Sequence, residues 1–338
     1  PWDGPASILF SDGDIMGAVL DRNGLRPSRY YVTNDGYLIL SSEVGVLPIA
    51  ESRIKVKDRL RPGKMLLVDT VKGELIDDDE LKEKYATKQP YGEWLDNNLV
   101  QLHDLKIPNQ KVPMHTKEER ARLQKAFGYT YEDLKTSILP MALNGSESIG
   151  AMGIDTPLAV LSNRHQPLFN YFKQLFAQVT NPPIDSIREK IVTATTVYLG
   201  KDGNILEEQP ENCKNLKINN PILTNTDLLK IKNMKVEGFK VETIPITYYK
   251  NTSIEKAIDH LFVEVDRAHR EGANIIILSD RGVDENHVAI PSLLAVGAVQ
   301  HYLVQTKKRT SMAVILESGE PRDVHHFATL LGYGASAI

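Results

Sequence analysis

Acidic and basic side chains follow two apolar runs near the C-terminus, and these are the residues whose types could carry chemistry. Asp280, Arg281, Asp284 and Glu285 come after the run NIIIL, and Glu317 comes after MAVIL. Carboxylates can act as general acids or bases, and both kinds of group form ion pairs. Ligands of parallel β/α barrels gather at the carboxyl ends of the strands, so a site is to be sought in these two loops. Ion pairing without catalysis is the alternative, because loops commonly contain such residues.

The loop GAMGIDTP (150–157) is a second candidate, because backbone N–H groups of glycine-rich turns can bind an anion. It lacks the Lys-Ser/Thr pair of a phosphate-binding loop. We therefore favour a close-packed turn here unless another domain docks on it.

The histidines and the single cysteine give no metal-site pattern. His325 and His326 are neighbours on a predicted helix and point about 100° apart, so they cannot share one metal-binding face. Cys213 is the only cysteine, which excludes an internal disulfide and a cysteine-ligated zinc or iron–sulfur site within this chain. We expect surface or core histidines and an incidental thiol.

The last hundred residues alternate between strand and helix patterns, which is typical of parallel strands joined by helices. The strand patterns contain continuous apolar runs, as expected for strands covered on both faces. This predicts at least half of a β/α barrel. An open doubly wound sheet is the alternative, but no G-x-G-x-x-G follows these strands. The predicted strands are 239–249, 273–280, 310–318 and 333–338, and the predicted helices are 253–272, 290–309 and 320–332.

The first part of the chain has a different pattern, with short strands separated by turns. TNDG (33–36) and DTVKG (69–73) have the turn chemistry of β-hairpins, which predicts an antiparallel sheet region. A helix with an acidic first turn is expected over 77–86. The predicted strands are 6–10, 15–20, 30–33, 37–42 and 64–69.

Between these regions the sequence predicts a linker and several helices. Residues 87–118 are polar and contain three prolines, which indicates a linker or wrapping segment. Thr116 and Glu119 form a capping-box pattern, and Thr130 is expected to cap a second helix that Pro140 ends.

The run PLFNYFKQLFAQV (167–179) has helical spacing of its apolar residues, which predicts a buried helix face rather than a cofactor site. TNPPID (180–185) must end that helix. The predicted stripe consists of Leu168, Tyr171, Phe172, Leu175, Phe176 and Val179.

Length and composition limit the class of protein. A chain of 338 residues favours two domains. With 41% hydrophobic and 25% charged residues and a net charge of −4, it gives no electrostatic reason to expect nucleic acid or an anionic membrane as a partner. It has neither a membrane-spanning apolar run nor a signal-peptide pattern, so we expect a cytoplasmic protein. Its first residues enter a strand without a methionine or a leader, which suggests a piece of a longer chain.

Several stretches together resemble one family, the glutamate synthases. DGPASILFSDGDIMGAVLDRNGLRPSRYYVTNDGYLILSSEVGVL (3–47) resembles the last third of their type-2 glutamine amidotransferase domain. Three further stretches resemble the central domain of the family, namely LPMALNGSESIGAMGIDTPLAVLS (139–162), YFKQLFAQVTNPPIDSIRE (171–189) and LSDRGVDENHVAIPSLLAVGAVQHYLV (278–304). The resemblance covers essentially the whole chain in one order.

The resemblance implies an enzyme that works as a relay. An N-terminal cysteine hydrolyses glutamine, ammonia passes through an internal tunnel, and a flavin barrel with an iron–sulfur cluster adds it to 2-oxoglutarate and reduces the imine. The nucleophile would then lie upstream of Pro1, and the FMN and cluster ligands downstream of Ile338. No cofactor, metal or catalytic residue is expected in this chain. Its partners would be the remaining amidotransferase and FMN-binding domains, with a small NADPH-oxidising subunit as a further candidate.

The implied fold class is α/β with an α+β N-terminal piece. Residues 1–90 would be the C-terminal part of the amidotransferase domain, an antiparallel sheet remnant of an αββα glutaminase sandwich. Residues 91–338 would be the central domain, a rudimentary parallel β/α barrel-like domain, with 91–117 as a linker or wrapping segment.

The resemblance also suggests residues at the tunnel or at contacts between domains. Gly24 would allow a tight turn, and Arg22, Arg26 and Glu43 could form ion pairs inside the sandwich without catalysis. The family's loop is closer to Gly-Ser-Met-Gly-Asp-Asp-Thr-Pro, so Ala151 and Ile154 depart from it. The candidate contact residues are Arg22, Gly24, Arg26, Gly150, Met152, Gly153, Asp155 and Thr156.

We therefore expect a connector that positions two active sites, walls part of the ammonia path and is inactive alone. One alternative is an autonomous ligand-binding or catalytic barrel that uses Asp280, Arg281 and Glu317. Another is a different amidotransferase, although the strands after Thr243 lack a nucleotide-binding loop. The determinants of the electron donor, NADPH, NADH or ferredoxin, would lie in other parts of the parent chain.

Overall fold

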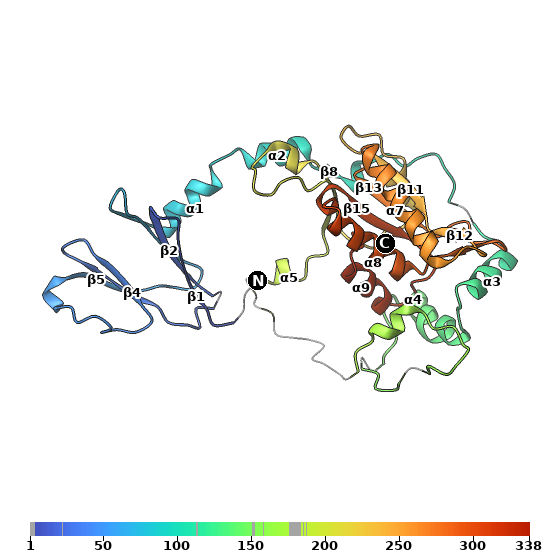
Figure 1. The fold of residues 1–338 in the computed structure, drawn as a ribbon, viewed down its shortest axis with the longest axis horizontal. Helices are drawn as coiled ribbons and strands as arrows, with labels where there is room; N and C mark the ends of the chain where they lie inside the picture. The colour runs from blue at the N-terminus through green and yellow to red at the C-terminus, as the bar shows by residue number, and fades with distance from the viewer. Residues whose placement is uncertain are drawn as a thin grey trace. The chain divides into compact units, whose positions relative to one another are not determined.

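The chain divides into two compact units, Pro1–Tyr91 and Gly92–Ile338, and each is described by itself (Figure 1). The computed structural model describes residues 4–21, 23–112, 114–150, 153–157, 159–175, 184, 186 and 188–338.

The first unit contains two antiparallel sheets and one helix, as the hairpin signals predict. One sheet has the order β1 (Ser7–Ser11), β2 (Ile15–Leu20), β6 (Met65–Asp69), β7 (Glu74–Ile76). The other has the order β4 (Leu38–Ser41), β3 (Arg29–Thr33), β5 (Ile54–Arg59). Helix α1 (Asp78–Ala86) begins at Asp77, whose side chain accepts a hydrogen bond from the Asp79 N–H. Strand β5, which follows the 3₁₀ turn η1 (Glu51–Arg53), was not predicted.

A small hydrophobic core holds this unit together. Its fully buried members come from β2, from β6 and from Leu60, directly after β5. Side chains of β3 and β4 pack against it, so residues from both sheets contribute. The core consists of Ala18, Leu20, Leu60 and Leu66, with Tyr30, Leu38 and Leu40 around it.

The second unit is built on a parallel sheet of three strands, in the order β11 (Val241–Pro245), β13 (Ile275–Ser279), β15 (Ala313–Glu317) (Figure 1). Ile275 pairs with Val241 on one side and with Ala313 on the other. Ala337 forms a further parallel bridge with Ile315, where a full strand 333–338 was predicted.

Apolar side chains cover both faces of this sheet. On one face, Ile276 and Leu278 pack with helices α7 (Ile254–Arg270), α8 (Ser292–Gln305) and α9 (Val324–Gly332). On the other face, Ile275 and Ile277 pack with helix α6 (Asn225–Lys232) and strands β9 (Val197–Gly200) and β10 (Asn215–Ile218). Successive side chains of a strand point to opposite faces, so a continuous apolar strand requires both covers. The prediction of buried parallel strands is confirmed.

Two smaller sheets complete the second unit. Strand β8 (Val100–Gln101) pairs in parallel with β10, and β10 pairs with β9 antiparallel. Strand β12 (Thr247–Tyr249) pairs with β14 (His287–Ala289), so the strand predicted over 239–249 is interrupted at Ile246. The predicted linker also contains helix α2 (Tyr91–Asn98) and the 3₁₀ turn η2 (Leu102–Asp104).

Helix α3 (Lys117–Ala126) begins with the predicted capping box, since Thr116 and Glu119 exchange both hydrogen bonds. The prediction that Pro140 ends the next helix is wrong. The π-helical turn η3 (Asp133–Ile138) continues directly into α4 (Leu139–Asn144), with Pro140 in its first turn. The π-helical turn interrupts the regular α-helical hydrogen bonds directly before Pro140, so a residue without an N–H is accommodated there. The helix ends instead at Gly145, which is left-handed with φ 66°.

The run predicted as a helix over 167–179 begins as the 3₁₀ turn η4 (Leu168–Phe172). Phe169 is its buried residue, and Leu168 of the predicted stripe packs against the core. Tyr171, Phe172 and Leu175 are exposed, so the prediction is wrong for these three residues. A turn with three residues per repeat does not align side chains at the 3.6-residue spacing of an α-helix. Phe176, Val179 and TNPPID, with Ile184 excepted, lie outside the described residues.

Three short segments complete the described structure, namely α5 (Glu189–Val192), η5 (Pro210–Cys213) and η6 (Arg309–Ser311). Among the described residues, no helix has the length and apolar character needed to cross a membrane.

Helix α7 provides a matched test of the core. Val265 is fully buried against the sheet, whereas Val263 on the same helix is 58% exposed. We expect Val265→Ala to lower the opening free energy of β13 and β15 by about 2 to 3 kcal/mol through lost burial and a cavity. Val263→Ala should change it by less than about 0.5 kcal/mol. Hydrogen exchange of peptides from β13 and β15 measures both, and equal effects would contradict the assignment of this helix face.

Candidate functional site

Glu317 is the centre of a cluster at the carboxyl ends of β13 and β15. The two strands are in register there, with Ser279 opposite Glu317. The Glu317 carboxylate accepts hydrogen bonds from Ser279 Oγ at 2.7 Å, Lys232 Nζ at 2.7 Å and Arg281 Nε at 2.5 Å. Burial opposes its ionisation, but the hydrogen bonds from Lys232, Arg281 and Ser279 outweigh burial and lower its pKa. Glu317 is therefore an anion fully engaged by side chains of the same chain.

Asp280 lies beside this cluster and is 6% exposed. It accepts hydrogen bonds from Ser318 Oγ at 2.6 Å and from the Gly319 N–H at 3.1 Å. Burial raises its pKa to about 6, even though these hydrogen bonds favour the charged form. The pKa of Asp280 therefore lies closer to neutral pH than that of an ordinary aspartate. A carboxyl group with such a pKa is suited to general acid or base chemistry.

The other predicted carboxylates of these loops do not join the cluster. Asp284 is exposed and contacts His287, with 3.0 Å between Oδ1 and Nδ1. Glu285 is also exposed, and its carbonyl accepts a hydrogen bond from Lys250 Nζ. The structure thus brings together Asp280, Arg281 and Glu317 and leaves Asp284 and Glu285 apart.

The segment from Phe127 to Asp133 closes this edge of the sheet. The Tyr129 hydroxyl donates to the Gly319 carbonyl at 2.7 Å. A Cβ on Gly319 would approach the Phe127 ring to 3.2 Å, so the two chain segments are in close contact. Side chains of this segment therefore contact the loop after β15, at the edge of the sheet where a catalytic barrel would hold its ligand.

Arg322 fixes the closing segment. Its side chain is buried, and Nη1 forms an ion pair with Asp133 Oδ2 at 2.8 Å. The guanidinium lies 4.0 Å from the centre of the Tyr129 ring and also donates to the carbonyls of Phe127 and Gly128. A bidentate donor that stacks on an aromatic ring suits such a buried contact. Sequence reasoning missed Tyr129 and Arg322, because almost 200 positions separate the partners.

Glu320 supports the neighbouring helix rather than starting a new one. Its Oε2 accepts from the Ser292 N–H at 2.7 Å and from Ser292 Oγ at 2.6 Å, at the first turn of α8. The helix predicted over 320–332 begins later than expected, because α9 starts after Asp323, whose carboxylate accepts from the His326 N–H.

His326 is a core histidine, as predicted for histidines without partners at ligand spacing. Its ring stacks on Phe169 with 4.2 Å between centroids, and Nδ1 accepts from the Arg322 N–H. Burial lowers its pKa to about 4, which keeps the ring neutral at neutral pH. The neighbouring His325 turns its Nε2 to the Phe169 carbonyl at 2.9 Å.

The described residues do not fit a metal cluster. They contain no group of three His, Cys, Asp or Glu side chains arranged to hold a metal ion. Cys213 stands at the end of η5 as a half-buried free thiol.

The turn DRNGLRP in the first unit is organised by Asp21. Its carboxylate accepts from the N–H groups of Leu25, Ala6, Asn23 and Arg26 at 3.0 to 3.4 Å. The hydrogen bond from Leu25, with the other three, lowers the pKa of Asp21 against the effect of burial. The sequence interpretation assigned no role to this aspartate, although the Asp-x-x-Gly turn chemistry is visible in the sequence.

Gly24 has the predicted turn role, with φ 62° and a hydrogen bond from its N–H to the Asp21 carbonyl. Arg26 and Glu43 are exposed and form no ion pair with any described residue, so the expected pairing between them is absent there. Arg22 lies outside the described residues.

The candidate contact loop 150–157 is mostly exposed where the structure describes it. Gly150, Asp155 and Thr156 are exposed and Gly153 is half-buried, while Met152 lies outside the described residues. Gly150 does not have the positive φ that a backbone anion nest uses. The loop is attached by the Ile154 N–H, which donates to the Gln174 carbonyl at 2.9 Å.

Two family models match the chain. Residues 122–338 match the glutamate synthase central domain. The chain belongs to this family. Residues 1–94 match the class-II glutamine amidotransferases. Both matches agree with the resemblance recognised in the sequence.

Curated relatives cover all of this chain. It is 46% identical over 338 residues to the glutamate synthase [NADPH] large chain of Bacillus subtilis and 45% identical over 351 residues to the glutamate synthase [NADH] of Schizosaccharomyces pombe. It is 42% identical over 351 residues to ferredoxin-dependent glutamate synthase 2 of Synechocystis. The chain spans 22%, 17% and 22% of the length of these relatives. It therefore corresponds to about a fifth of a glutamate synthase large chain.

The buried Asp280 makes stability depend on pH. Its folded pKa of about 6 lies above its ordinary value of 3.8, so the folded chain holds the proton more tightly than the unfolded chain. Its contribution to stability is full below about pH 4 and is lost as the pH rises through about 6, with a total of about 3 kcal/mol. We expect the opening free energy of β13 and β15, measured by hydrogen exchange, to fall over this window. The neutral variant Asp280→Asn should lack that fall; an unchanged pH profile would contradict the assignment.

A second prediction concerns substitution of Gly24, and Gly73 serves as its control. Both have a positive φ, 62° and 69°, but a Cβ on Gly24 would lie 2.5 Å from Pro62 Cγ, whereas a Cβ on Gly73 meets nothing within 4 Å. The left-handed conformation costs an alanine about 1 to 2 kcal/mol at either position. We expect Gly24→Ala to lower the opening free energy of β2 and β6 by at least about 1 kcal/mol more than Gly73→Ala. Equal losses in hydrogen exchange would show that Pro62 gives way without cost.

Proposed function

We propose that this chain is the part of a glutamate synthase large chain that joins the glutaminase to the flavin-containing synthase domain and walls part of the ammonia path between them. The observation that carries the proposal is the closed carboxyl edge of the parallel sheet. Asp280, Arg281 and Glu317 are bound by the chain's own groups, and the segment from Phe127 to Asp133 contacts the adjacent loop at Gly319. Polar groups that are all paired internally support structure rather than catalysis.

We propose a domain division at about residue 90. Residues 1–90 would be the C-terminal part of the amidotransferase domain and the two antiparallel sheets part of its αββα sandwich. Residues 91–338 would be a barrel-like central domain, with 91–117 as the connecting segment. Three parallel strands in sequential order, extended by the bridge at Ala337, support this assignment.

We place the glutaminase nucleophile, the FMN and the iron–sulfur cluster of the parent chain outside this sequence. The relatives named for NADPH, NADH and ferredoxin are 46%, 45% and 42% identical to it. A part of the protein that contacted the electron donor would be expected to differ among these three groups, so donor specificity belongs elsewhere in the parent chain. A small NADPH-oxidising subunit would be a further partner of that chain.

The loop 150–157 is proposed as a contact with the other domains. Asp155 and Thr156 are exposed and their side chains form no hydrogen bond with the described residues. Ile149 and Leu161, which flank the loop, are almost fully exposed apolar residues. Exposed apolar side chains near one loop are typical of a surface that another part of a protein covers.

An autonomous ligand-binding barrel is the second candidate function, and one observation favours it. Asp280 is a buried carboxyl group with a pKa raised to about 6, as catalytic acids often have. This candidate requires that the purified chain bind a small molecule or flavin, and that Asp280→Ala abolish the binding. A colourless chain without such binding would leave the connector as the better account.

The contact loop tests the connector. In a full-length chain that carries this sequence, Thr156→Arg should let ammonia escape, because a bulky cation replaces a small side chain at the proposed contact. We expect the glutamine-dependent ammonia released per glutamate formed to rise at least about threefold, while synthesis from added ammonium is retained. Thr310→Arg, also at an exposed threonine, is the control. Unchanged coupling in Thr156→Arg would contradict a contact at this loop.

A further inference from the structure

A second site is suggested by a pocket of about 200 Å³ at the carboxyl ends of the parallel strands β8 and β10. It lies within the second unit and is separate from the Glu317 cluster. Gln101 and Lys217 are paired in the strand register, and the chain continues from them into the pocket wall. The start of α6 forms another side of it. Carboxyl ends of parallel strands are common ligand sites in α/β proteins.

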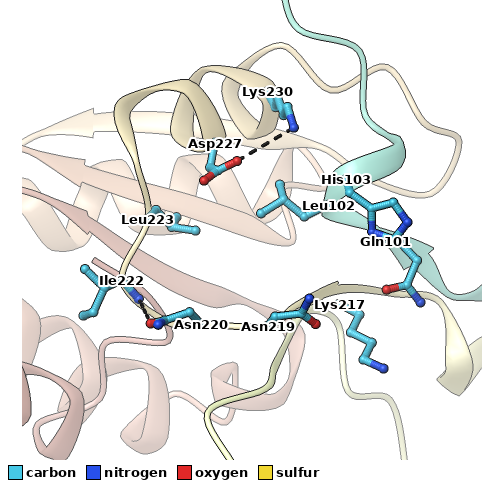
Figure 2. A pocket seen from close by; sticks show the side chains of 10 residues that line it. All are labelled: Gln101, Leu102, His103, Lys217, Asn219, Asn220, Ile222, Leu223, Asp227 and Lys230. Atoms are coloured by element: carbon cyan, nitrogen blue, oxygen red, sulfur yellow. Dashed lines mark hydrogen bonds and ion pairs between the residues drawn. The ribbon is translucent and has the colours of Figure 1, made fainter.

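The pocket has an apolar wall and a polar wall. Figure 2 shows Leu102 and Leu223 between Asp227 and Lys230 on one side and Asn219 and Asn220 on the other. Leu102 and Leu223 also pack against the core on the second face of the sheet. Such a combination of apolar lining and a few polar groups is typical of small-molecule sites.

Lys230 is the group of this pocket that lacks a close partner. Its side chain is 13% exposed, and its Nζ lies 3.8 Å from Asp227 Oδ1, which is beyond hydrogen-bond distance. Asp227 itself is engaged by Thr224, whose Oγ1 donates to Oδ2 at 2.7 Å. Among the described residues, the Lys230 ammonium has no hydrogen-bond acceptor. An ammonium group whose nearest carboxylate lies beyond hydrogen-bond distance gains from a closer anionic partner.

The other charges and the backbone of the pocket suit an anion. Lys217 also lines the pocket and has no ion pair with a described residue, so the lining contains two lysines and one aspartate. The wall is fixed, since Asn220 Oδ1 accepts from the Ile222 N–H at 2.9 Å and the Leu223 N–H donates to the Ile338 carbonyl at 2.7 Å. A fixed wall lowers the entropy cost of binding.

We propose that this pocket binds a small carboxylate-bearing metabolite, whose carboxylate pairs with Lys230 and whose carbon chain lies against Leu102 and Leu223. At about 200 Å³ the pocket is smaller than the roughly 300 to 1,000 Å³ of sites for drug-sized ligands, so a small metabolite suits it better than a nucleotide or a flavin. The apolar wall distinguishes an organic acid from inorganic phosphate, which shares only the charge.

Leucine amides report on the pocket directly. In the chain labelled with [¹⁵N]leucine, titration with succinate should shift the amide resonances of Leu102 and Leu223 in a saturable way. Lys230→Met keeps the aliphatic stem and removes the charge, and it should weaken binding about tenfold or more. Lys256→Met, at an exposed lysine of α7, should bind as the unaltered chain does.

Titrations with phosphate and with 1,4-butanediol test which chemical features of the ligand the pocket recognises. Succinate-specific shifts that depend on Lys230 support the proposal. Equal affinity for phosphate would overturn the carboxylate assignment in favour of a general anion site, and equal affinity for butanediol would overturn the role of charge. Absence of saturable shifts at Leu102 and Leu223, or binding that Lys230→Met leaves unchanged, would overturn the site. If the proposed connector function were wrong, these outcomes would not change, because the titration does not involve the contact loop.

Discussion

Burial of both faces of the sheet β11, β13, β15 is the constraint on which the second unit depends. Ile275 to Leu278, four consecutive residues of β13, have no exposed surface, so this strand needs apolar cover on both faces. Helices α7, α8 and α9 supply one cover, and α6 with β9 and β10 supplies the other. Polar groups cannot be placed within such strands without a cost in desolvation, and they therefore collect where the strands end. The cluster of Ser279, Asp280 and Glu317 is a consequence of this arrangement.

The polar residues at that edge then require partners, because a buried charge without one is strongly destabilising. Glu317 accepts hydrogen bonds from Lys232 and Arg281, and Glu320 accepts one from the Ser292 N–H in the first turn of α8. Each carboxylate thereby ties one helix or loop to the sheet. Arg322 extends the same principle to the segment from Phe127 to Asp133, which closes the edge. Groups that resemble an active site by type and position can stabilise the fold here, and their pairing within the chain is the physical difference.

Local signals predicted most of the elements correctly. The apolar runs at 275–279 and 313–317, the spacing of α7 and the capping box at Thr116 depend on neighbours within one or two turns, so they can be read from the sequence. The failures have non-local or subtle causes. The π-helical turn accommodates Pro140, and the contact between Tyr129 and Gly319 joins residues 190 positions apart. Arg281 and Glu317 could be predicted as ion-pairing residues, but the segment that contacts the neighbouring loop at Gly319 could not.

The pocket at β8 and β10 shows why a closed edge and a ligand site can coexist in one unit. At the edge of the central sheet, Asp280, Arg281 and Glu317 have partners from the chain, and Phe127 and Tyr129 contact the loop at Gly319. At the smaller sheet, β8 is only two residues long and α6 begins close to it, which leaves a space that no long side chain fills. Asp227 is held by the helix cap at Thr224 and does not reach Lys230 closely. The difference in pairing, rather than the residue types, is what separates the structural cluster from the candidate ligand site.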